Sequence, residues 1–104
     1  MFRHEANMHL HVIASIVVLA MAYRFDVSRT EWCILLLCIG LVWMAETFNT
    51  AIETLTNLVS PEYHPLAGKA KDLAAGAVLL AAITAAIVGL IIFIPYWLVY
   101  FNVY

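Results

Sequence analysis

Long stretches of this 104-residue chain contain no Asp, Glu, Lys or Arg, and their lengths limit what the chain can fold into. They cover residues 6–23, 32–45 and 73–104. A helix needs about 20 residues to cross a bilayer core about 30 Å thick. The third stretch is long enough, the first nearly reaches, and the second can continue because no Pro or Gly follows it before residue 59. We therefore predict an all-α membrane protein whose three transmembrane helices cover roughly residues 7–24, 31–58 and 70–94.

The composition excludes several other classes of protein. Hydrophobic residues make up 65% of the chain and charged residues 12%, against about 45–50% and about 25% in an average soluble domain. A disordered tail and an ordinary soluble enzyme are therefore excluded. The net charge of −2 provides no basic field for a nucleic-acid partner. We expect residues 1–104 to form a single integral-membrane domain.

The connections between the predicted spans carry the expected helix boundaries. Residues 24–31 hold four charges, and either Ser28 or Thr30 is suited to cap the second helix. Residues 60–68 contain two prolines and a glycine, which end one helix and allow a turn before the next. We expect Pro95 to interrupt the third helix near its far end.

The distribution of basic residues gives a weak signal of orientation. Arg3, Lys69 and Lys71 fall on the side of the N-terminus, and Arg24 and Arg29 fall on the other. This small excess favours a cytoplasmic N-terminus.

The aromatic residues after Pro95 resemble a membrane-interface belt; they are Tyr96, Trp97, Tyr100, Phe101 and Tyr104.

Five polar residues interrupt the second span and share one side of the helix. Glu46, Asn49, Thr50, Glu53 and Asn57 fall within a stripe about 100° wide at 100° per residue. A carboxylate in the membrane costs at least about 2.5–3.5 kcal/mol. The stripe is therefore either a polar seam between the helices of an oligomer or a metal-binding and catalytic face. A single three-helix subunit is not expected to bury this stripe on all sides, which favours an oligomer.

The spacing of the two carboxylates in this stripe suggests two separate tasks. Glu46 and Glu53 are seven residues apart, or about 10 Å along the helix axis, so one metal ion cannot easily bind both. Carboxylates suit Mg²⁺, which takes few protein ligands and keeps water or phosphate oxygens. We expect a deeper carboxylate acting as a base and a metal ligand nearer the surface.

Residues 69–72 are predicted to open the third helix and offer a candidate phosphate site. Lys69 and Lys71 beside a helix N-terminus could face an anion together with the backbone N–H groups. The alternative is that both are interfacial lysines whose charges reach into water. The sequence contains neither a GxxxxGK[ST] loop nor a GxGxxG motif.

Three segments of the sequence, in order and with matching spacing, resemble one known family. Residues 46–53 resemble the E-x-x-N-[ST]-A-I-E core of the small bacterial integral-membrane lipid kinases, which are the diacylglycerol kinases and undecaprenol kinases. Residues 62–79 resemble the second motif of that family, H-x-L-x-x-x-A-K-D followed by an A-A-V-L run. Residues 5–11 look like the E-x-N-x-x-x-H opening of the undecaprenol-kinase branch.

The resemblance implies a multi-pass homotrimer in the bacterial cytoplasmic (inner) membrane, with its site facing the cytoplasm. It implies transfer of the γ-phosphate of ATP to the hydroxyl of a membrane lipid. Asn7, His11 and residues 64–66 favour undecaprenol as that lipid, and diacylglycerol is the alternative.

The resemblance also implies roles for individual residues. Glu46 matches the catalytic base, and Asn49 matches a residue that helps hold that region. Glu5 and Glu53 match the carboxylates that hold Mg²⁺ with the ATP phosphates. The implied nucleotide-binding residues are Glu5, Glu53, Glu62, Tyr63, His64, Lys71 and Asp72.

The sequence departs from the family pattern at two places. Members usually carry an amphipathic surface helix before the position of Glu5, where only four residues stand here; either the chain starts late, or its site is more open, or it is impaired. Asn57 replaces an Asp that is common in the family.

The alternatives to a lipid kinase are a non-catalytic relative that binds lipid or nucleotide, and a small membrane transport or assembly subunit.

Overall fold

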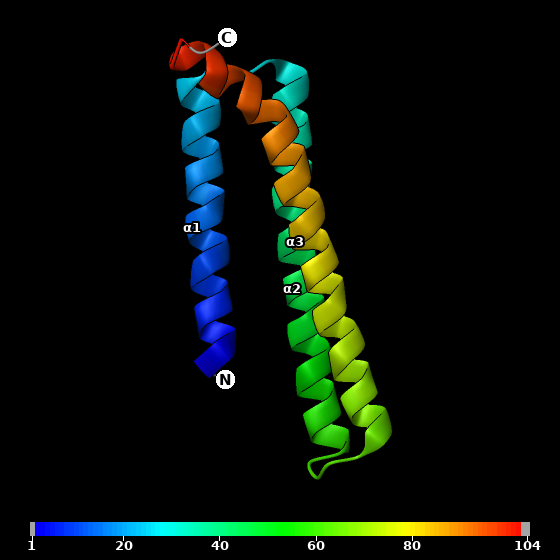
Figure 1. Cartoon of the computed structure of the whole chain (residues 1–104). Helices are drawn as coiled ribbons and strands as arrows, with labels where there is room; N and C mark the ends of the chain where they lie inside the picture. The colour runs from blue at the N-terminus through cyan, green and yellow to red at the C-terminus, as the bar shows by residue number, and fades with distance from the viewer. Residues whose placement is uncertain (1, 103–104) are drawn as a thin grey trace.

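Three long helices account for almost the whole chain in a computed structural model that describes residues 2–102, with side chains described from residue 7 onward. Helix α1 is Phe2–Arg24, α2 is Arg29–Val59 and α3 is Pro65–Tyr100 (Figure 1). Each contains a segment long and apolar enough to cross a membrane. The prediction of an all-α protein with three membrane-spanning helices is therefore confirmed.

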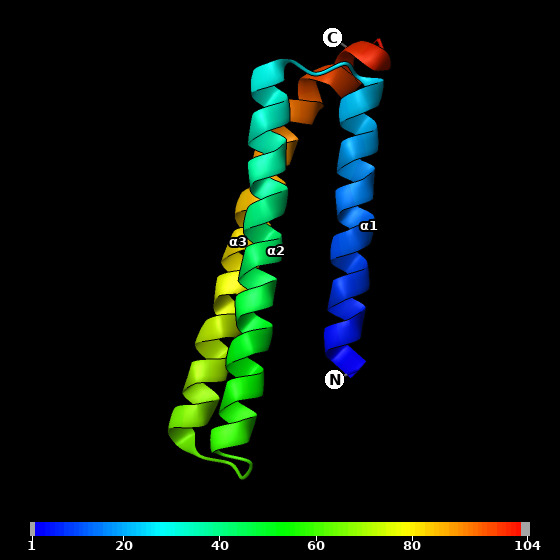
Figure 2. The same cartoon turned by 180° about the vertical axis from the view of Figure 1, so that it is seen from behind.

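Helices α2 and α3 form a long antiparallel hairpin, and α1 runs beside it (Figures 1 and 2). The closed end of this hairpin projects beyond the N-terminus of α1 in both views. The molecule is 57 Å long, whereas a bilayer with its headgroups is about 40–45 Å thick. One end of the hairpin is therefore able to stand in water while the rest of the three helices remains in the membrane.

The turn between α1 and α2 is fixed by backbone hydrogen bonds. The N–H of Val27 donates to the carbonyl of Ala22 at 3.2 Å, and that of Asp26 donates to Tyr23 at 3.2 Å. Asp26 takes a left-handed conformation with φ 52°. This pattern is a Schellman motif, in which a hydrophobic contact commonly accompanies the hydrogen bonds. Val27 and Ala22 are both buried and belong to one hydrophobic cluster.

Ser28 begins α2 with a reciprocal cap. Its hydroxyl oxygen accepts a hydrogen bond from the Glu31 N–H at 3.1 Å, and the Glu31 carboxylate accepts one from the Ser28 N–H at 3.0 Å. This arrangement is a capping box, which satisfies two backbone donors at once. Of the two residues suited to cap this helix, Ser28 rather than Thr30 has the role.

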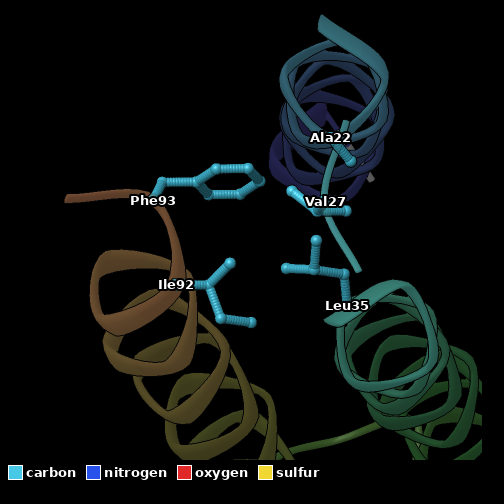
Figure 3. Close-up of a cluster of buried hydrophobic side chains, with 5 residues drawn as sticks. All are labelled: Ala22, Val27, Leu35, Ile92 and Phe93. Atoms are coloured by element: carbon cyan, nitrogen blue, oxygen red, sulfur yellow. The ribbon is translucent and has the colours of Figure 1, made fainter. Parts of the chain in front are cut away.

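All three helices meet in a small hydrophobic core near the α1–α2 turn. Its buried members are Ala22, Val27, Leu35, Ile92 and Phe93 (Figure 3). The Phe25 ring extends this core by packing against Tyr96 and Trp97, with ring centroids 5.7 Å and 5.0 Å away. The hydroxyl of Tyr96 also donates to the Glu31 carboxylate. These contacts attach the end of α3 to the turn between the other two helices.

Helix α3 is longer at both ends than the sequence predicted. It begins at Pro65 and not near residue 70, because proline suits a first helical turn whose N–H groups have no intrahelical partner. It also continues through Pro95 to Tyr100, so Pro95 does not end it. The ribbon bends in its last turns and crosses toward the end of α1 (Figure 1), as expected when a proline removes one hydrogen bond within a helix.

The earlier start of α3 corrects the prediction that residues 69–72 open this helix. Lys69 and Lys71 are the fifth and seventh residues of this helix, whereas the N–H groups without intrahelical partners belong to its first four residues. The ring nitrogen Nδ1 of His64 accepts a hydrogen bond from the N–H of Leu66 at 3.1 Å, so part of this helix end is already capped. The two lysines therefore do not lie beside free backbone amides.

Candidate functional site

Glu46 is the most deeply buried charged residue that the structure describes. It lies in the middle of α2 and is 1% exposed. Its Oε2 atom is 3.4 Å from Nε2 of His11 on α1. A carboxylate is costly to bury in a membrane unless polar groups surround it, and the imidazole is one such group.

Hydrogen bonds link the backbone at His11 to α2. The hydroxyl of Ser15, one turn further along α1, donates to the His11 carbonyl at 2.7 Å. The indole N–H of Trp43, one turn before Glu46 on α2, donates to the Ser15 hydroxyl at 3.0 Å. The rings of His11 and Trp43 have centroids 6.2 Å apart. The imidazole is thus placed beside Glu46 by contacts between two helices.

The sequence did not predict this contact. In the sequence, His11 stands out only as part of the opening motif of the family. Its pairing with Glu46 depends on which side of α1 faces α2. A histidine inside an apolar span was the available signal, since ionisable residues in a membrane usually have a partner.

The polar stripe of α2 is buried at its deeper end and exposed at the other. Asn49 is buried with Glu46, Thr50 and Glu53 are half-buried, and Asn57 is exposed. One chain alone therefore encloses Glu46 and Asn49. The expectation that a single subunit cannot bury the stripe is wrong at these two residues, and the burial of Glu46 gives no argument for an oligomer.

A groove of about 350 Å³ opens beside Glu46. Its lining comes from α1 and α2 and consists of Met8, Trp43, Glu46, Thr47, Thr50 and Ala51. The hydroxyls of Thr47 and Thr50 both donate to backbone carbonyls one turn earlier in α2, at 2.8 Å and 3.0 Å. The groove is mostly apolar, and Glu46 contributes to its lining while both of its carboxylate oxygens are buried.

The projecting end of the hairpin brings Lys71 of α3 to the stripe of α2. The ammonium of Lys71 donates a hydrogen bond to Oδ1 of Asn57. Asn57, which replaces the Asp common in the family, therefore still accepts a hydrogen bond from Lys71 but carries no charge. The other predicted nucleotide-binding residues near this end are all exposed; they are Glu62, Tyr63, His64 and Asp72.

A larger groove of about 490 Å³ lies between α2 and α3 at the same end. It includes Leu55, which is nine residues after Glu46 and therefore on the opposite side of α2. His64 is the only predicted nucleotide-binding residue in its lining. This groove therefore does not belong to the polar stripe, although it is larger than the one beside Glu46.

The predicted metal site is only partly within the described side chains. Glu53 is half-buried on α2, whereas the side chain of Glu5 lies outside the described residues. Over the part of the chain that the structure describes, no three His, Cys, Asp or Glu residues are grouped to hold a metal ion. A site with one or two carboxylates still fits Mg²⁺, because this ion takes most of its ligands from water and phosphate.

The fold and the site define a multi-pass membrane protein with a buried carboxylate at a groove and charged groups at a projecting end. The chain belongs to the prokaryotic diacylglycerol kinase family, since the sequence model of that family matches residues 1–93. The protein is accordingly a membrane lipid kinase.

Individual relatives carry two different kinase names. The chain is 43% identical over 93 residues to the undecaprenol kinase of Bacillus subtilis (strain 168), covering 89% of this chain and 76% of that protein. It is 40% identical over 95 residues to the diacylglycerol kinase of Synechocystis sp. (strain ATCC 27184 / PCC 6803 / Kazusa), covering 90% of this chain and 54% of the relative. It is 34% identical over 84 residues to the diacylglycerol kinase of Escherichia coli (strain K12), covering 81% and 69%.

Proposed function

We propose that this kinase transfers the γ-phosphate of ATP to the hydroxyl of undecaprenol, with Glu46 as the general base. The observation that carries the proposal is the burial of Glu46, 1% exposed, among the residues that line a mostly apolar groove. A lipid alcohol in this groove would lie beside Glu46 without having to leave its apolar surroundings.

The reaction requires one proton transfer and one phosphoryl transfer. The lipid O–H bond breaks and its proton passes to the Glu46 carboxylate, while the oxygen forms a bond to the γ-phosphorus. The bond from that phosphorus to the β,γ-bridging oxygen breaks, and ADP leaves with the electron pair. Phosphoryl transfer depends mainly on positioning and on neutralising charge, and a positioned base contributes about 10²–10⁴-fold.

The nucleotide would bind at the projecting end of the hairpin. Lys71 would contact the phosphates, and Glu62, Tyr63, His64 and Asp72 are exposed there. Glu5 and Glu53 would hold Mg²⁺, which neutralises phosphate charge when bound. Asn49, buried one turn from Glu46, would help hold the region between the two substrates. Because ATP is cytoplasmic, this end would face the cytoplasm across the bacterial inner membrane, in agreement with Lys69 and Lys71 on that side.

Hydrogen bonding around the groove favours undecaprenol over diacylglycerol. The hydroxyls of Thr47 and Thr50 and the indole N–H of Trp43 already donate to other groups. Diacylglycerol carries two ester carbonyls close to its hydroxyl, and acceptors buried without a donor cost about 1–3 kcal/mol each. A polyprenol has no such acceptors. The name of the Bacillus subtilis relative supports the same choice.

A homotrimer is proposed on the family resemblance. Many large apolar side chains are exposed on all three helices of the single chain. In a membrane, lipid tails and neighbouring subunits can both cover such surfaces, so this exposure is compatible with a trimer and does not fix the number of copies.

A competition assay tests the choice of lipid. Equal amounts of undecaprenol and diacylglycerol are supplied in mixed micelles with Mg²⁺ and ATP labelled on the γ-phosphate. We expect most of the label in undecaprenyl phosphate. Label mainly in phosphatidic acid would make diacylglycerol the substrate, and label in neither lipid would contradict the proposed activity.

A further inference from the structure

We propose that His11 is a positioning residue that orients the Glu46 carboxylate for the lipid hydroxyl. This inference rests on the proposed role of Glu46 as the base. The imidazole Nε2–H would donate to Oε2, from which it is 3.4 Å away, and this hydrogen bond would fix the orientation of the carboxylate. Hydrogen bonds among catalytic groups are often long in the absence of substrates and tighten when substrates bind.

The location of His11 along α1 explains why it needs additional contacts. It is 11 residues from Ala22, which lies in the hydrophobic core near the other end of α1. That separation is about 16 Å along the helix. Over its whole length, α1 makes far less contact with α2 than α3 does. Apolar packing at the turn therefore does little to fix the distance between His11 and Glu46.

Trp43 and Ser15 supply the missing constraint. The Trp43 indole donates to the Ser15 hydroxyl, and this hydroxyl donates to the backbone carbonyl of His11. Trp43 precedes Glu46 by three residues, so the two side chains share one side of α2. The two hydrogen bonds thus connect the backbone that carries the imidazole to the helix turn that carries the carboxylate. The His11 side chain is itself only 16% exposed, which limits its alternative orientations.

The test compares His11→Leu with His11→Gln by steady-state kinetics on the full chain in detergent and lipid. Leucine removes the donor, and we expect kcat to fall by at least about 10-fold with little change in the KM for ATP. Glutamine keeps an N–H donor at a similar distance from the backbone, so His11→Gln should retain most of the turnover. His9→Leu is the matched control, because His9 is exposed two residues away on the same helix, and it should behave as wild type.

His11→Leu in a Glu46→Gln background separates a positioning role of His11 from a structural one. If His11 acts through Glu46, His11→Leu should lower the residual turnover by less than about 2-fold there, because coupled residues are not additive. An equal loss in both backgrounds, or a His11→Gln variant as impaired as His11→Leu, would overturn this inference alone. Full activity of Glu46→Gln would instead overturn the proposed base, and this inference with it.

Discussion

Glu46 and Glu53 stand seven residues apart on one side of α2, yet Glu46 is fully buried and Glu53 is half-buried. Helix α1 covers Glu46, whose Oε2 is 3.4 Å from Nε2 of His11, whereas Glu53 lies about 10 Å further along α2, toward its turn with α3. A buried carboxylate can meet a lipid hydroxyl, and a partly hydrated one can meet a metal–nucleotide complex.

Glu53→Gln should weaken the use of Mg²⁺ and ATP. Removing one carboxylate lowers the charge of a Mg²⁺ site and hence its affinity. We expect activity at low Mg²⁺ to fall by more than about 10-fold, with partial recovery as Mg²⁺ rises. Titration of kinase activity with Mg²⁺ measures this. Glu46→Gln is the control, since excess Mg²⁺ cannot replace a base. A Glu53→Gln variant with the Mg²⁺ dependence of the wild type would show that the metal assignment is wrong.

Helical periodicity predicted the polar stripe from the sequence but not its environment. The spacing of Glu46, Asn49 and Glu53 places them on one side of α2 in any helix. Which of them is buried depends on how α1 and α3 pack against α2, and this packing does not follow from local spacing. For the same reason the pairing of His11 with Glu46, 35 residues apart, could not be predicted.

At the scale of the elements, Ser28 determines how α2 begins. Ser28→Ala removes the acceptor for the Glu31 N–H, and loss of such a cap costs about 0.5–2 kcal/mol. Thermal unfolding in detergent should show lower stability for Ser28→Ala, with lipid kinase activity per folded protein unchanged. Thr30→Ala is the matched control, because Thr30 is also exposed at this helix end but is not the cap. Equal destabilisation by both substitutions would contradict the capping role.

The helices themselves were predictable, and their ends less so. Long charge-free stretches predicted the number and type of elements because membrane thickness sets a minimum span. Pro65 and Pro95 were both interpreted as breaks. Pro65 instead begins α3, and Pro95 lies within it, since a proline is tolerated in a first turn and can bend a membrane helix without ending it. Packing of Phe25 against Tyr96 and Trp97 helps hold the segment beyond Pro95 in place.

At the scale of the whole molecule, one chain encloses Glu46 but leaves many large apolar side chains exposed on all three helices. We predict a homotrimer from the family resemblance. Chemical cross-linking and native mass measurement in detergent should show three copies. A monomer with full kinase activity would contradict the prediction.

The most direct test of the central claim is the turnover of Glu46→Gln with undecaprenol and Mg²⁺-ATP, measured on protein shown to be folded. Glutamine has nearly the same shape as glutamate and carries no charge to bury, so folding and assembly should be unaffected. Because the amide cannot take the lipid proton, we predict that kcat falls by at least about 10²-fold with little change in the KM for ATP. A folded Glu46→Gln variant that keeps most of its kinase activity would show that Glu46 is a structural residue and would contradict the mechanism.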